Sequence, residues 1–208
     1  MKTAVIVFNL GGPESIDEVK PFLYRLFSDP EILRIKSPFL RHAVAYAASA
    51  FRNRQSSGYY RKIGGGSPIR RITEEQATAL SDELRWAGME VDVLVGMCCW
   101  HPFLSETLDA VERSGADRLV VLPLFPQFSV TTTGSGFRTL EGLIGERPAL
   151  SGIDVRWIAS WQNQPTYIAA FAALIRRELE KFPKPDGVQI LFSAHSVPER
   201  CVRDGDPY

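Results

Sequence analysis

TAVIVFNLGGP, residues 3–13, is the stretch that most strongly indicates the fold of this chain. Residues 3–10 form an almost continuous apolar run, and the turn-forming sequence Gly-Gly-Pro follows at once. Such a run, closed by turn residues, is typical of a parallel β-strand that is buried on both faces. The chain is therefore expected to begin with an inner strand of a parallel sheet.

Strand and helix patterns alternate along the rest of the chain. The alternation predicts an α/β fold, in which a parallel, doubly wound sheet carries helices on both faces. The later strands are expected at 91–97, 117–125, 154–159 and 187–194, and the helices at 15–27, 37–54, 73–87, 103–115, 139–145 and 164–182.

Composition and charge narrow the class of protein. The 208 residues carry 24 basic and 24 acidic side chains, so the formal net charge is zero, and 45% of the residues are hydrophobic. These values are typical of a folded soluble protein and give no electrostatic reason to expect a nucleic-acid partner. No apolar run reaches about 18 residues, so no membrane-spanning helix is expected. Three cysteines favour a reducing compartment, and we expect a cytoplasmic protein.

The strand ends suggest what kind of ligand the protein binds. Ligands of doubly wound sheets bind beyond the carboxyl ends of the strands, and here the residues at those ends are mostly aromatic and apolar. This favours a large, flat, apolar ligand held by a few polar groups. His195 follows the last expected strand, where a neutral imidazole could bind a transition metal or accept a proton. A core histidine hydrogen-bonded to the backbone explains its position equally well.

Two further features have structural explanations as well as functional ones. Cys98 and Cys99 are adjacent, would face opposite sides of a strand, and lack a CxxC spacing, so we expect buried thiols rather than a metal site. The helix expected at 37–54 is apolar around its whole circumference. Either it is buried on two sides, or one side meets a hydrophobic ligand or a membrane surface.

Several motifs together resemble one family. The ending LFSAHSVPERCVRDGDPY at 191–208 is similar to the ferrochelatase signature, which has the form LFSAHxxP followed by GDPY. The resemblance extends in order over FNLGGPES at 8–15, YRKIGGGSPIRRIT at 60–73, WHP at 100–102 and LFPQFSVTTTGS at 124–135. The chain thus resembles the N-terminal portion of a bacterial-type ferrochelatase. The resemblance implies a chelatase-like fold of two similar flavodoxin-like lobes, with residues 1–149 forming the first lobe and 150–208 the first βαβ unit of the second.

The resemblance also implies an activity and a site. Ferrochelatases insert Fe²⁺ into protoporphyrin IX in the terminal step of haem biosynthesis, so the porphyrin and Fe²⁺ are the expected partners. The essential histidine of the family falls on His195, which would act in catalysis and contact the metal. The resemblance places the porphyrin-binding positions on Leu10, Arg52, Tyr60, Ile63, Ser67, Phe125, Thr133 and Trp161. Arg52 would meet a propionate, and a leucine at position 10 favours protoporphyrin over coproporphyrin.

The chain departs from the family pattern at three points. Cys98-Cys99 replaces the Arg-Tyr pair of many members, a pair associated with the path of the metal and the protons. Val130 stands where animal enzymes carry a cluster cysteine, so Fe²⁺ is expected only as the substrate metal and no iron–sulfur cluster is expected. Family members are longer, and their further segment carries the acidic partner of the histidine. The 208 residues alone are therefore expected to show little insertion activity.

Other functions remain open at this point. The chain could be a non-catalytic tetrapyrrole-binding or metal-binding fragment, or a chelatase for coproporphyrin or for another metal. Peripheral association with the inner membrane and the oligomeric state are also left open by the sequence.

Overall fold

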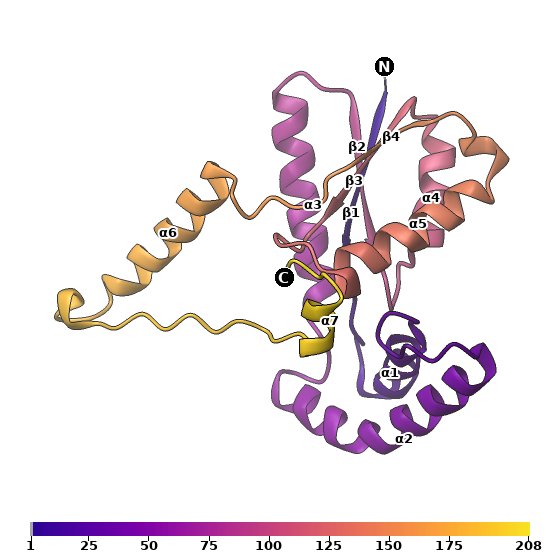
Figure 1. Cartoon of the computed structure of the whole chain (residues 1–208). Coiled ribbons are helices and arrows are strands. Elements are labelled where there is room, and N and C mark those ends of the chain that lie inside the picture. Colours follow the sequence, from indigo (N-terminus) through magenta and orange to yellow (C-terminus); the bar gives the residue numbers. More distant parts are fainter. Residues whose placement is uncertain (1) are drawn as a thin grey trace.

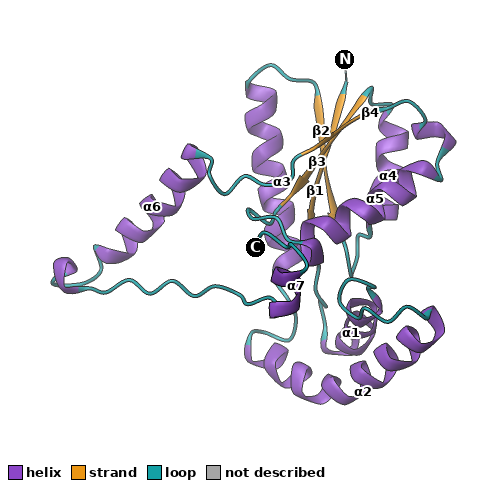
Figure 2. Cartoon of the chain, viewed as in Figure 1, coloured by secondary structure: helices purple, strands orange, loops and turns teal. Residues whose placement is uncertain are grey.

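The computed structural model describes residues 2–208 and contains one parallel sheet (Figures 1 and 2). Its strands follow the order β2-β1-β3-β4, which is the flavodoxin-like order. The strands are β1 (Thr3–Asn9), β2 (Val91–Met97), β3 (Arg118–Pro123) and β4 (Asp154–Trp157). Strand β1 pairs with both β2 and β3, and β4 pairs with β3 at the sheet edge. The predicted parallel α/β fold, opened by an inner strand, is confirmed.

The helices cover both faces of this sheet. Because side chains alternate across a strand, Val5 and Val7 pack against Ala77 of α3, whereas Ile6 and Phe8 pack with α4 and α5 on the opposite face. The α-helices are α1 (Val19–Ser28), α2 (Pro38–Lys62), α3 (Ile69–Trp86), α4 (Leu104–Ser114), α5 (Ser135–Gly145), α6 (Pro165–Leu179) and α7 (Glu199–Arg203). Short 3-10 turns lie at η1 (Ile16–Glu18), η3 (Pro148–Leu150) and η4 (Pro185–Gly187), and η2 (Val130–Gly134) is a π-helical turn.

The strand predicted at 187–194 is not formed. Residues 188–198 are irregular, and no strand of the described chain pairs with them. The apolar run VQILF fits a strand, but a strand forms only where a neighbour supplies hydrogen-bond partners for its backbone. The prediction was therefore wrong within residues 2–208. The short helix α7, which follows this segment, was not predicted.

The strand predicted at 154–159 does not open a second sheet. It forms β4, which pairs with β3 in the register Arg118↔Asp154, and Arg118 Nε donates to an Asp154 oxygen at 2.8 Å. The sequence PALSG at 148–152 indicated a junction, but Leu150 is buried in the same core as Ile6. The boundary expected at 149/150 therefore has to move beyond Trp157. The division into two lobes stays a prediction.

The chain leaves the body of the protein after β4 and returns to it at α7. Helix α6 has no buried residue and projects away from the sheet, and an extended segment leads back to α7 (Figure 1). Among residues 2–208, no helix combines the length and the hydrophobicity needed to cross a bilayer.

Candidate functional site

A cavity of about 630 Å³ lies at the carboxyl edge of the sheet. Leu10 follows β1, and Phe125 follows β3, so the strand-end rule predicts ligand binding at this place. The C-terminal segment forms the other side of the cavity. The lining residues of that segment are His195, Ser196, Val197, Pro198, Arg200, Cys201 and Tyr208.

His195 is exposed at the rim of this cavity and is not a core residue. Its imidazole makes no hydrogen bond to any of the residues described here. The alternative of a core histidine satisfied by the backbone therefore does not fit. In the neutral ring one nitrogen is therefore free to bind a metal or a proton, and the N–H of the other is free to donate to a ligand. No group of three His, Cys, Asp or Glu side chains within residues 2–208 is placed to hold a metal ion, so His195 has no second protein ligand in such a group.

Three further predicted residues lie next to the cavity residues. Tyr60 packs in the same apolar cluster as Leu10, and burial raises the pKa of its hydroxyl. Trp161 donates from its backbone N to Pro126 O at 2.9 Å and from its indole Nε1 to Pro123 O at 2.7 Å. Thr133 lies in η2 and is fully buried, and its Oγ1 has no hydrogen-bond partner among the residues described. These side chains support the wall of the cavity rather than line it.

The remaining predicted residues lie outside the cavity. Arg52 is exposed on α2, and Ile63, just after α2, is 61% exposed. Ser67 donates from its backbone N to Pro13 O at 2.7 Å, and a Cβ on Gly12 would lie 2.7 Å from its side chain. Ser67 thus packs the glycine-rich turn against the turn that follows β1, which is a structural role.

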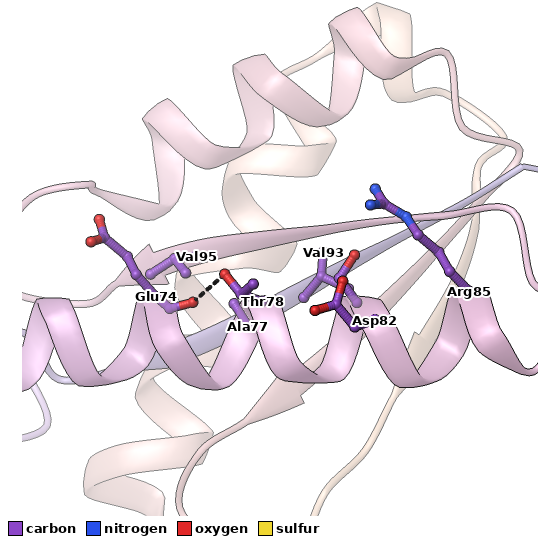
Figure 3. Close-up of a pocket in the computed structure, with 8 residues that line it drawn as sticks. Glu74, Ala77, Thr78, Asp82, Arg85, Val93 and Val95 are labelled. Carbon is purple, nitrogen blue, oxygen red and sulfur yellow. Dashed lines mark hydrogen bonds between the residues drawn. The ribbon is translucent and has the colours of Figure 1, made fainter.

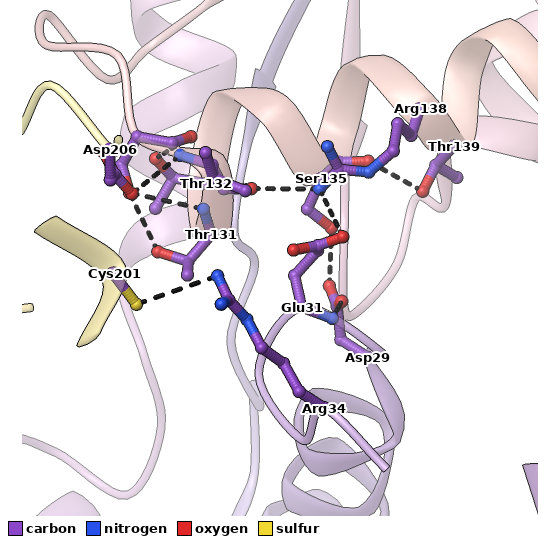
Figure 4. A network of polar contacts seen from close by, with 12 residues as sticks. Asp29, Glu31, Arg34, Thr131, Thr132, Ser135, Arg138, Thr139, Cys201 and Asp206 are labelled. Carbon is purple, nitrogen blue, oxygen red and sulfur yellow. Dashed lines mark hydrogen bonds and ion pairs between the residues drawn. The ribbon is translucent and has the colours of Figure 1, made fainter. Parts of the chain in front are cut away.

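A polar network fastens the C-terminal segment to the cavity (Figure 4). The buried Asp206 accepts hydrogen bonds through Oδ2 from Ser129 Oγ at 2.8 Å and from Val130 N at 3.0 Å. Arg34, in the loop after α1, forms an ion pair with Asp204, and this carboxylate raises the pKa of the guanidinium. Asp206 and Arg200 were not singled out from the sequence. The GDPY motif was the signal available for Asp206.

A second cavity of about 500 Å³ contains both adjacent cysteines. Cys98 and Cys99 line it together with Asp29 and His42, because residues 98–100 form a bend after β2 rather than a strand. The expectation that their side chains face opposite sides was therefore wrong. Burial raises the pKa of the Cys99 thiol to about 12 and also raises that of Cys98, so both thiols are protonated at neutral pH.

A third cavity, of about 320 Å³, lies between α3 and the outer edge of β2 (Figure 3). Glu74, Asp82 and Arg85 lie along its α3 side, and Val93 and Val95 along its β2 side. None of the residues predicted for the site lies there. The cavity that contains His195 is therefore the candidate site.

The fold and this cavity define the class: a doubly wound α/β protein with a mainly apolar ligand site at the carboxyl edge of a parallel sheet. A family model described as ferrochelatase matches residues 2–208, and the chain belongs to the ferrochelatase family. The resemblance of its motifs is thus confirmed.

Relatives with the same name align over the whole chain. Ferrochelatases of Cyanothece sp. (strain PCC 7425), Synechococcus sp. (strain JA-3-3Ab) and Thermosynechococcus vestitus are 50%, 50% and 49% identical over all 208 residues. These alignments cover 54%, 61% and 54% of the respective relatives. The chain thus spans between half and two thirds of the length of these relatives.

Proposed function

We propose that the protein inserts Fe²⁺ into protoporphyrin IX to form protohaem, at the cavity that contains His195. The observation that supports this most strongly is an exposed imidazole, without a hydrogen-bond partner among residues 2–208, at the rim of an apolar cavity at the sheet edge, in a chain of the ferrochelatase family. The cavity volume of about 630 Å³ falls within the range of roughly 300–1,000 Å³ typical of small-molecule sites.

The reaction requires a proton acceptor near the macrocycle. As Fe²⁺ enters the ring, two pyrrole N–H bonds break, the nitrogens keep the electron pairs, and two protons leave. A neutral imidazole accepts a proton near pH 7 and is also a good ligand for Fe²⁺. We assign both roles to the one basic nitrogen of His195, in succession: it first binds the incoming metal ion and, once the metal has passed to the ring, takes up one pyrrole proton, while the second proton leaves to solvent water.

The walls of the cavity suit a flat apolar ring with acidic substituents. Leu10, Phe125 and Ile32 would contact the ring, and Arg200 would pair with a propionate. Tyr60, Thr133 and Trp161 would hold this wall in place. Leu10 is also the basis for proposing protoporphyrin as the substrate, because an apolar side chain fits a vinyl group better than a further carboxylate. In this conformation Arg52, Ile63 and Ser67 would take no direct part.

We also propose that the protein is cytoplasmic and that it associates peripherally with an anionic membrane surface through α2. Phe39 and Phe51 on this helix are 85% and 86% exposed. The charged residues of α2 are all basic: Arg41, Arg52, Arg54, Arg61 and Lys62. Exposed aromatic groups beside cations are typical of helices that lie on anionic lipid.

Co-sedimentation with vesicles tests the membrane proposal. We expect binding to phosphatidylglycerol vesicles at low salt, weaker binding at high salt, and a loss of most binding in a Phe39→Ser/Phe51→Ser variant, because both apolar burial and charge contribute. The matched control is Trp86→Ser, since Trp86 is 87% exposed but lies at the end of α3. Equal binding to neutral vesicles, or an equal loss in the control, would contradict the proposal.

Anaerobic incubation of a protein as long as these ferrochelatase relatives, rather than of residues 1–208 alone, with protoporphyrin IX and Fe²⁺ tests the enzymatic proposal. The expected result is an Fe²⁺-dependent loss of porphyrin absorbance and the appearance of protohaem. Porphyrin binding without insertion would favour a non-catalytic tetrapyrrole-binding protein. Faster turnover of coproporphyrin, or of another metal, would indicate a different chelatase.

A further inference from the structure

We propose that Asp206 is a positioning residue, whose buried carboxylate fastens residues 195–208 to the loop after β3 and thereby sets the place of His195 in the cavity. The effect of Asp206 on ligand binding rests on the proposed function. The attachment of residues 195–208 to the loop after β3 does not.

The contacts of Asp206 are those of a structural anchor. The residue is 5% exposed, and no other charged side chain among residues 2–208 is buried. Its Oδ2 accepts from Ser129 Oγ and Val130 N, and its Oδ1 accepts from Tyr208 N at 3.1 Å. Burying a carboxylate is unfavourable unless hydrogen bonds replace its water, and three donors do so here. Ser129 lies in the loop after β3 and lines the cavity, and Val130 follows it, so these bonds join that loop to the segment after α7.

A second contact supports the anchor from another direction. Arg34 forms an ion pair with Asp204, and its guanidinium also lies 4.0 Å from Cys201 Sγ, which is buried. This pair is partly exposed, and exposed ion pairs contribute little to stability because water and salt screen them. The hydrogen bonds of Asp206 therefore hold the segment more strongly than the ion pair between Arg34 and Asp204 does.

The chain before His195 offers little to hold the residue in place. Helix α6 has no buried residue, and residues 188–198 have no regular secondary structure. The His195 side chain makes no hydrogen bond to the described residues. Its position therefore depends on the contacts that follow it, at α7 and at Asp206. Because the same segment lines one side of the cavity, the cavity has its shape only while this anchor holds.

Hydrogen exchange tests the fastening directly. Asp206→Ala should speed exchange of the α7 amides by at least about tenfold. Loss of a hydrogen bond to a charged group changes the equilibrium between the closed and the open segment by about this factor or more. Asp186→Ala is the matched control, because Asp186 is exposed in η4 and should leave these rates unchanged. Asp206→Asn should restore most of the protection, because its amide oxygen can still accept from Ser129 and Val130. Unchanged exchange in Asp206→Ala, or an equal rise in the control, would overturn the proposal.

Binding of protoporphyrin IX, followed by its fluorescence, tests the positioning role. Asp206→Ala should weaken binding by about tenfold or more while the thermal midpoint of the sheet stays close to that of the wild type, and Asp206→Asn should rescue binding. Wild-type affinity in Asp206→Ala, with α7 released, would refute the positioning of the site. If the wild type binds no porphyrin, the proposed function fails, and the exchange experiment still decides the fastening.

Discussion

His195 and Asp206 lie in one segment and have opposite surroundings. The imidazole is exposed and makes no hydrogen bond to the described residues, whereas the carboxylate is buried and accepts three. A group that must meet a ligand has to remain free, and a group that fixes a segment has to be satisfied within the fold. We therefore assign the chemistry to His195 and the positioning to Asp206.

A substitution of Arg200 tests whether this residue pairs with a carboxylate of the porphyrin. Arg200 lines the cavity, so Arg200→Ala should weaken protoporphyrin binding by roughly tenfold through the loss of a carboxylate partner. The dimethyl ester of the porphyrin should bind both proteins equally. The control is Arg203→Ala, because Arg203 pairs with Glu199 and does not line the cavity. Equal affinity of Arg200→Ala and wild type for the free acid would contradict this role.

Helix α5 shows how closely one element must approach the sheet. A Cβ on Gly136 would overlap the ring of Phe8, which is fully buried, whereas a Cβ on Gly142 of the same helix meets nothing within 4 Å. Gly136 therefore allows the contact that holds the end of α5 beside the strand ends.

Alanine at these two glycines should have opposite effects. Gly136→Ala should lower the free energy of unfolding by about 1–3 kcal/mol through overpacking. Gly142→Ala should raise it by about 0.5–1 kcal/mol, because alanine is the better helix former. Urea denaturation of both variants measures this difference, and a stabilised Gly136→Ala would show that α5 is not packed on Phe8 as described.

The elements with local signals were predictable from the sequence. Apolar runs marked β1, β2 and β3, and the helices expected at 73–87 and 103–115 form as α3 and α4, although α3 begins earlier, at Ile69. The failures concern elements that depend on distant residues. The run at 187–194 is not a strand because nothing in the described chain pairs with it, and β4 belongs to this sheet because of its pairing with β3. Whether a strand finds a partner, and which strand that partner is, cannot be predicted from local composition.

At the scale of the whole molecule, the strand-end rule brought Leu10 and Phe125 to one cavity, whereas His195 reaches this cavity on an irregular segment and not at the end of a strand. Local patterns could not place Arg52 and Ile63, since these lie on or just after a long helix whose direction depends on packing. The bonds between Asp206 and residues 129–130 are also invisible in the sequence, because they join segments far apart in the chain. The remaining site assignments are proposals.

The separation of binding from insertion in His195→Ala tests the central claim most directly. Protoporphyrin affinity and the rate of Fe²⁺ insertion are measured on the same preparations of the intact protein and its variant. We expect a porphyrin affinity within about threefold of the wild type and an insertion rate lowered by at least about a hundredfold, as is typical for the loss of an acid–base group. Insertion at the wild-type rate would contradict the assignment of His195 and of the cavity it lines.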